Sequence, residues 1–241
     1  MVPFFIILTI IALIVILSLR KRYLVYQREA FIRRYSFPMG LFAKLKEQHP
    51  SLSSRDCQLV SRALRQYFLA HLKSNRRFVS MPSQVVDSLW HEFILYTKDY
   101  QAFCDKAFGQ FMHHSPAVTL SKNKPSNEGL RRCWWYACKD DNINPKQPAR
   151  LPLLFAIDQK LKIANGFHYL ANCDGIRRLQ VGSAATAATA AVVYCGGDFS
   201  SSSFDGGTEG FGDDGGSASS DSGGDSGGDG GGCGGGCGGG D

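Results

Sequence analysis

An uncharged apolar run opens the chain and constrains everything that follows it. Residues 2–19 contain 14 Ile, Leu, Val and Phe residues among 18 positions and no charged side chain. As an α-helix rising ~1.5 Å per residue, this run spans ~27 Å, close to the ~30 Å hydrocarbon layer of a bilayer. Each of these side chains favours insertion by roughly 0.3–0.6 kcal/mol. We therefore predict a single transmembrane anchor over residues 1–22, with residues 2–19 in contact with membrane lipid.

Basic residues mark one side of the apolar run. Arg20, Lys21 and Arg22 follow it directly, whereas only the α-amino group lies on the other side. The positive-inside rule then predicts a single-pass membrane protein with a cytoplasmic body. A cleaved signal peptide is the alternative, but no basic segment precedes the run and no small-residue cleavage pattern follows it. In a reducing compartment the eight Cys residues are expected to be thiols or metal ligands, not disulfides.

The charge of the chain changes sign after Arg178. Residues 1–178 contain all 27 basic residues and 12 of the 21 acidic ones, a net charge of +15, whereas the remainder carries −9. A basic body attracts nucleic acid, anionic lipid headgroups or the acidic end of its own chain. The sequence has no helix-turn-helix, zinc-finger or RNA-binding aromatic spacing. These observations favour a membrane partner and argue against nucleic acid.

The C-terminal end of the chain is rich in glycine. Residues 196–241 contain 21 Gly, nine Ser and nine acidic residues, too few apolar groups to offset the entropy of an ordered chain. We predict a disordered Gly/Ser/Asp tail, preceded by an Ala-rich linker over residues 181–195. The tail thiols Cys233 and Cys237 could bind a soft metal, pair on oxidation or attach a partner. Composition drift in a solvating tail is the simpler interpretation.

Between the anchor and the tail, apolar residues recur at helical spacing, and no run alternates convincingly with period two. Residues 23–50 predict a juxtamembrane helical connector, and residues 51–180 predict a helical domain. Ser53, with Asp56 three residues later, has the pattern that begins a helix. The predicted fold class is therefore mainly α, with an N-terminal single transmembrane helix, a helical globular body and a disordered Gly-rich tail.

The helical domain divides further at its turn residues. Residues 81–116 predict two helices that meet near Tyr96, the second of which ends at Gly109. Helical spacing also covers residues 127–138 and the segment from Leu154 to Leu161. Three arginine pairs are interpreted as solvated surface, with lipid headgroups as the alternative partner: Arg76-Arg77, Arg131-Arg132 and Arg177-Arg178.

The most specific motifs of the body are Met81-Pro82-Ser83, Trp90-His91-Glu92-Phe93, Phe108-Gly109 and His113-His114. This pattern resembles the glycine-rich domain-containing protein family, in particular its bacterial members, which look like an uncharacterised helical domain followed by a glycine-rich tail. Residues 150–158 are similar to the same members. The resemblance covers roughly residues 55–175 and the tail composition, and it implies an architecture but no activity. Phe93 stands where related plant proteins often have a second histidine, which weakens any metal role implied by the family.

Several residues of the body could bind a metal ion. Asp87 and His91 are four residues apart and therefore share one face of a helix. Together with Cys104 and either His113 or His114, they offer the mixed O, N and S ligands that zinc accepts in tetrahedral geometry. The alternative is that the cysteine packs in the core, that Asp87 and His91 form a local pair, and that the two adjacent histidines lie in a loop.

These observations favour a membrane-anchored helical interaction or scaffold module that binds a protein partner through its body or tail, with zinc binding as an added hypothesis. The alternative is a metal- or thiol-dependent enzyme that uses His91, Cys104 and His113 or His114. In the thiol version, a neighbouring base or positive charge would activate Cys104 as a thiolate. Both the metal and the enzyme hypotheses require these side chains to converge.

Overall fold

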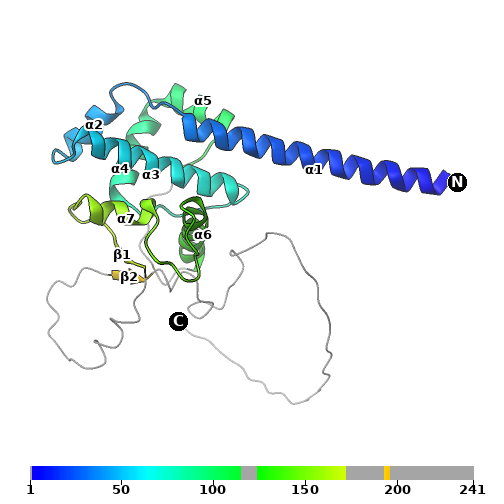
Figure 1. Cartoon of the computed structure of the whole chain (residues 1–241). Coiled ribbons are helices and arrows are strands. Elements are labelled where there is room, and N and C mark those ends of the chain that lie inside the picture. Colours follow the sequence, from blue (N-terminus) through cyan, green and yellow to red (C-terminus); the bar gives the residue numbers. More distant parts are fainter. Residues whose placement is uncertain (1, 115–123, 172–192, 196–241) are drawn as a thin grey trace, which may run out of the picture. The chain divides into compact units, whose positions relative to one another are not determined.

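The computed structural model describes residues 2–114, 124–171 and 193–195 (Figure 1). Within these ranges the mainly α prediction is confirmed. The predicted tail, with Cys233 and Cys237, lies outside the described residues. The elements are, in order, α1 (Val2–Arg34), α2 (Leu41–Gln48), α3 (Ser54–Lys73), α4 (Gln84–Leu95), α5 (Thr97–Ala107), α6 (Lys124–Asp140), α7 (Leu153–Lys160), β1 (His168–Leu170) and β2 (Val193–Cys195).

Helix α1 continues without a break from the apolar run into the body. It is the one helix in the described part of the chain that is long and apolar enough to cross a membrane, and a signal sequence would pass the same test. Over residues 4–19 of this helix, the exposed fractions of the large apolar side chains range from 48% at Val15 to 65% at Phe4. Ile32, near its other end, is completely buried. The two ends of α1 therefore meet different surroundings.

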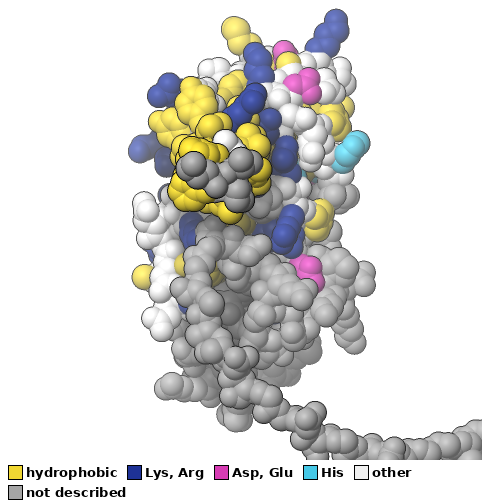
Figure 2. All heavy atoms as spheres, turned by 90° about the vertical axis from the view of Figure 1, so that its right-hand side faces the viewer, with side chains coloured by type: hydrophobic (Ala, Val, Ile, Leu, Met, Phe, Trp, Pro, Cys, Tyr) yellow, Lys and Arg dark blue, Asp and Glu magenta, His cyan; other side chains and the backbone are white. Residues whose placement is uncertain are grey.

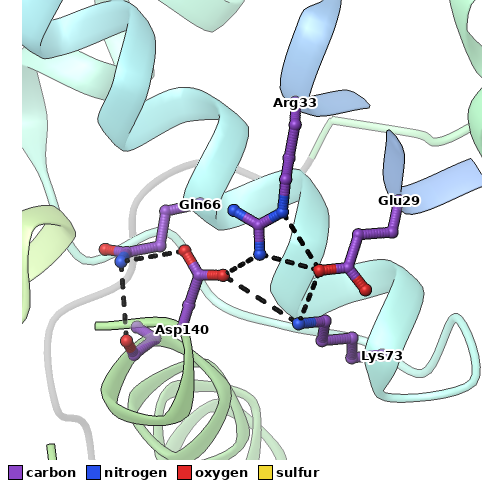
Figure 3. Close-up of polar contacts among 6 residues, drawn as sticks. Glu29, Arg33, Gln66, Lys73 and Asp140 are labelled. Carbon is purple, nitrogen blue, oxygen red and sulfur yellow. Dashed lines mark hydrogen bonds and ion pairs between the residues drawn. The ribbon is translucent and has the colours of Figure 1, made fainter. Parts of the chain in front are cut away.

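An ion-pair network holds the C-terminal part of α1 against α3 and α6 (Figure 3). Glu29 accepts a hydrogen bond from Arg33 Nη2 at 2.7 Å and pairs with Lys73 Nζ at 3.1 Å. Asp140 pairs with Arg33 and also accepts from Gln66 Nε2 at 3.4 Å. Burial opposes ionisation of Glu29, but the hydrogen bonds from Arg33 and Lys73 outweigh it and lower its pKa. The network therefore joins α1, α3 and α6 through charged side chains.

The long helix α3 contacts α1, α2, α4, α6 and α7 (Figure 1). It begins as the sequence predicts, because Asp56 N donates to Ser53 Oγ and the Asp56 carboxylate accepts from Ser53 N at 2.9 Å. Such reciprocal bonds satisfy backbone donors that the first helical turn would otherwise leave unpaired. From its buried face, the Phe68 ring packs 4.8 Å from that of Phe103 and the Tyr67 ring 5.0 Å from that of Trp90.

The segment predicted as a connector, residues 23–50, shares the core with the helical domain. Ile32, Leu41 and Leu45 are fully buried in the same apolar cluster as the aromatic residues of α3 and α4. The predicted division of residues 81–116 into two helices is confirmed, since α4 ends at Leu95 and α5 begins at Thr97. The last part of α1 is therefore part of the folded body.

Two features of the body differ from the prediction. Strands β1 and β2 pair in parallel, with His168 opposite Val193, so the last residues of the predicted Ala-rich linker form a strand. Three-residue strands are too short to show an alternating pattern. Arg131 and Arg132, predicted to be solvated, are only 4% and 8% exposed. Because α6 packs against α3, its covered face is wider than its apolar stripe, and Arg132 Nη1 donates to the carbonyl of Phe78.

Candidate metal centre

Three of the five predicted metal ligands come together. Asp87, His91 and His114 each offer one ligand atom, and these atoms all lie within 4.8 Å of one another. His114 Nε2 lies 2.9 Å from Asp87 Oδ1, and His91 Nδ1 lies 3.9 Å from Asp87 Oδ2. Each imidazole thus lies nearest a different oxygen of the carboxylate, and the two rings pack against each other with their centroids 4.0 Å apart.

Local structure at the start of α4 fixes two of these residues. Ser83 caps the helix, because its side chain accepts a hydrogen bond from Val86 N. Asp87 lies in the first turn, where the positive end of the helix dipole favours a carboxylate. His91 follows one turn later, which places it beside Asp87 on the same face. The predicted neighbourhood of Asp87 and His91 is therefore present.

The third residue, His114, is placed by a loop that Tyr100 holds. Gly109 has a φ of +73°, a left-handed conformation that suits glycine and turns the chain after α5. The Tyr100 hydroxyl donates to the carbonyl of Met112 at 2.5 Å and accepts from Trp90 Nε1 at 3.2 Å. Burial raises the pKa of Tyr100, so its hydroxyl remains a donor. The Trp90 ring in turn packs 4.5 Å from the His114 ring.

The Asp87 carboxylate is buried without a lysine or arginine partner. Its side chain is 7% exposed, compared with 15% for His114 and 54% for His91. Within the described part of the chain, the two histidines are the only groups that can pair with Asp87 as cations. A carboxylate taken out of water needs positive charge or hydrogen-bond donors nearby. A bound metal ion would supply that charge.

The distances in this cluster fit a metal ion after a small change at one residue. Oxygen and nitrogen ligands lie ~2.0–2.2 Å from zinc, so tetrahedral ligand atoms are about 3.3 Å apart. Asp87 and His114 are already close to this separation. His91 Nδ1, 3.9 Å from the carboxylate, has to come closer, and its side chain is more than half exposed although its ring packs 4.0 Å from that of His114. Three protein ligands leave one zinc position open, and two His plus one carboxylate also suit Fe(II).

The other two predicted ligands lie apart from this cluster. Cys104 is completely buried on α5, and burial raises the pKa of its thiol, although bonds with the backbone of Met112 and with Tyr100 oppose the rise. His113 is exposed, and its ring packs 5.0 Å from that of Phe111. A thiolate nucleophile needs a lowered pKa and access to a substrate. The geometry therefore favours the metal hypothesis at Asp87 and gives Cys104 a packing role.

A second buried carboxylate, at Asp158 on α7, was not foreseen from the sequence. It accepts hydrogen bonds from Ser83 Oγ at 2.7 Å, Gln84 N at 2.7 Å, Val85 N at 3.2 Å and Phe167 N at 3.0 Å. Two of these donors belong to the first turn of α4, whose backbone N–H groups have no partner within the helix. Asp158 therefore ties α7 to the start of the helix that carries Asp87.

Comparison with known proteins finds a protein family that the chain matches. A family model described as UCP032817-like matches residues 27–199 of the chain. The matched range begins within α1, after its apolar run, and includes Asp87, His91 and His114. No curated protein and no solved structure matches the chain. The resemblance to glycine-rich domain-containing proteins is a separate observation that this match does not test.

Proposed function

The chain belongs to the UCP032817-like family, and we propose that it is a membrane-anchored helical module that binds a divalent transition metal, zinc in the first place, at Asp87, His91 and His114. One observation carries this proposal: three ligand atoms lie within 4.8 Å of one another around a buried carboxylate. The resident ion would balance the charge of Asp87, which no described lysine or arginine does.

The membrane placement in this proposal is supported by α1. Its apolar side chains are exposed over residues 4–19, and burying them in lipid removes them from water. The basic residues directly after this run support a body on the cytoplasmic side. Alkaline carbonate extraction of cell membranes tests the anchoring, and a C-terminal reporter active only in the cytosol tests the orientation. Full-length protein in the soluble fraction, or an inactive reporter, would contradict the respective part.

As a module, the protein would present its metal to a partner. Three protein ligands leave a coordination position open, and the exposure of His91 indicates that this position faces solvent. A donor group from a partner protein could complete the coordination. The glycine-rich tail, residues 196–241, is a second candidate contact, in keeping with the resemblance described above. Pull-downs from cell extract with zinc-loaded, zinc-free and tail-deleted protein would separate these two contacts.

Metal binding is tested on the full chain, purified in detergent without chelators and without a histidine tag. The adjacent histidines provide matched variants, since His114 lies in the cluster and His113 does not. We expect His114→Ala to weaken zinc binding by about 100-fold, because a direct ligand is lost. His113→Ala and Cys104→Ser should bind zinc as the unmodified protein does. The measurements are metal content by mass spectrometry and competition titration with a zinc indicator.

Each result of this experiment bears on the proposal. Stoichiometric zinc or iron that His114→Ala loses and His113→Ala keeps would support it. Absence of stoichiometric metal, together with no zinc affinity tighter than micromolar, would overturn it. Equal losses in both histidine variants would also overturn it, because only one of the two residues faces Asp87.

A metal-dependent enzyme is the second candidate, and the ligand count favours it over a purely structural metal. Structural zinc sites are usually closed by four protein ligands, whereas catalytic sites keep one position for water. Zinc lowers the pKa of such water to about 7 and so makes a nucleophile near neutral pH. Acetohydroxamate, a small chelating anion, should bind the metal-loaded protein if the position is open. Failure to bind would count against this candidate and would leave the metal proposal intact.

A further inference from the structure

A hollow of ≈ 370 Å³ lies between α1 and the end of α3. It begins beside the apolar run of α1 and reaches the turn that follows α3. Figure 2 looks from the side towards which the N-terminal end of α1 extends and shows Lys and Arg side chains around its apolar side chains. The lining residues include Leu17, Arg20, Lys21, Leu24 and Arg28 from α1 and Arg76 from the turn after α3.

Four of these residues carry positive charge that no carboxylate among the described residues balances. Arg20, Lys21, Arg28 and Arg76 all line the hollow, and no Asp or Glu does. In the described part of the chain, none of the four has a carboxylate within 4.0 Å. One turn further along α1, Arg33 contrasts with them, because it pairs with two carboxylates. The hollow is therefore suited to an anion.

Two of the arginines converge on one backbone oxygen. Arg28 Nη1 and Arg76 Nη1 both donate to the carbonyl of Phe108, at 2.6 Å and 2.9 Å. A Cβ on residue 109 would lie 2.5 Å from Arg28 Nη2, so the glycine at this position leaves room for the Arg28 guanidinium beside the Phe108 carbonyl. The carbonyl orients the two guanidinium groups and leaves their other N–H groups for a ligand.

The backbone conformation at Arg76 also indicates that the position of its side chain matters. Asn75 and Arg76 have φ values of +55° and +62°, the left-handed region in which L-residues other than Asn are disfavoured. Arg76 N donates to the carbonyl of His71 at 2.9 Å, which closes the end of α3. Glycine would adopt this conformation without strain. An arginine here costs conformational energy and brings its guanidinium beside that of Arg28.

We propose that this hollow binds an anionic phospholipid, with the headgroup phosphate held by Arg28 and Arg76. Leu17 lies within the apolar run, and Arg20 begins the basic segment, so the hollow extends from hydrocarbon depth to headgroup depth. A phospholipid has the same order of groups, with acyl chains towards Leu17 and phosphate towards the guanidinium groups. Guanidinium N–H groups match phosphate oxygens in bidentate geometry. The inference rests on the membrane placement proposed above and is independent of metal binding.

The experiment uses the full chain in detergent and counts bound lipid by native mass spectrometry. Phosphatidylglycerol is compared with phosphatidylcholine of the same acyl chains. Arg28→Gln with Arg76→Gln should weaken phosphatidylglycerol binding about tenfold or more, because both phosphate donors are lost. Arg20→Gln with Lys21→Gln should weaken it about fivefold and leaves the Phe108 carbonyl untouched. Arg55→Gln with Lys98→Gln removes the same charge from exposed positions away from the hollow.

The outcomes separate a lipid site from simpler explanations. Preference for phosphatidylglycerol that falls in both hollow pairs and persists in the control pair supports the proposal. Should the first pair unfold by circular dichroism, the second pair decides. Equal binding of the two lipids, or an equal loss in the control pair, overturns the proposal. Displacement of the lipid by equimolar inorganic phosphate also overturns it, since the occupant would then be a free anion. Membrane extraction in cells tests the anchor separately.

Discussion

Asp87 and Asp158 are buried carboxylates at the same end of α4, and the fold treats them differently. Asp158 accepts four hydrogen bonds from neutral donors, two of which are backbone N–H groups of α4. Asp87 faces two histidines, and one of them stands 3.9 Å away with its side chain half exposed. A carboxylate that neutral donors satisfy completely is part of the scaffold. A carboxylate that faces two imidazoles, one of them beyond hydrogen-bond distance, is available for a ligand.

The largest effect is expected at the scaffold carboxylate. Asp158→Ala leaves four donors without their acceptor in the interior and should lower the free energy of unfolding by about 3 kcal/mol or more. Urea denaturation of the purified protein, followed by fluorescence of the buried Trp90 and Trp134, measures this loss. Asp158→Asn keeps one acceptor oxygen and should cost less. A stable Asp158→Ala protein with impaired zinc binding would reverse the roles assigned to the two carboxylates.

His71 extends the comparison to a buried base. Among the described residues, only one of its two ring nitrogens has a hydrogen-bond partner. Its Nδ1 lies 3.1 Å from the carbonyl of Arg77, and its Nε2 has no partner among the described residues. Burial lowers the pKa of His71 to about 4, against the hydrogen bond to Arg77 and with help from the charge of Arg76.

This lowered pKa predicts a loss of stability in acid. Between pH 6.5 and 4 the unfolded chain binds a proton at His71 that the folded chain does not, so stability is complete above this window and falls as the pH drops through it. The total loss from this group is at most about 3 kcal/mol. Denaturation midpoints of the unmodified protein and His71→Gln, measured across this window, should converge towards pH 4. Parallel curves would show that His71 does not titrate in this way.

At the site carboxylate, the effect should fall on binding and not on stability. Asp87→Ala removes the central ligand and should weaken zinc binding by about 100-fold. Stability without metal should change by less than about 1 kcal/mol, because His91 and His114 are partly exposed and can bond to water. Titration and urea denaturation on the same preparation give both values. A stability loss as large as that of Asp158→Ala would make Asp87 a scaffold residue.

The smallest effect is expected for His91→Ala. Because its side chain is 54% exposed and makes no hydrogen bond to Asp87, the free energy of unfolding should stay within about 0.5 kcal/mol. Zinc binding should still weaken, by about tenfold, since water can replace an exposed ligand. Unchanged zinc affinity would reduce the site to Asp87 and His114, too few protein ligands for tight binding.

Local signals in the sequence predicted much of the helical framework. The Ser53 cap, the break after Leu95 and the turn at Gly109 depend on residues within one or two helical turns. The pairing of β1 with β2 depends on residues more than 20 positions apart, and three-residue strands show no period. The burial of Arg131 likewise depends on the packing of α6 on α3, which local sequence patterns do not reveal.

In the candidate site, too, the sequence predicts what depends on neighbouring residues and not what depends on contacts between distant ones. Asp87 and His91 follow from their spacing on one helix. The choice of His114 over His113 depends on the direction of the loop after α5, to which the hydrogen bond from Tyr100 to Met112 contributes. A tyrosine on an apolar stripe is a general signal, since its buried hydroxyl needs a partner. Nothing in the sequence identifies which carbonyl that partner is.

The unbroken course of α1 has a mechanical consequence. Its exposed apolar half and the ion pairs of Glu29 and Arg33 lie on one rigid rod, with no hinge between them. Each residue added or removed between these two parts would rotate the body by about 100° around the rod and shift it by ~1.5 Å along the axis. The number of residues between the apolar run and Glu29 therefore sets the direction in which His91 and His114 face relative to that run.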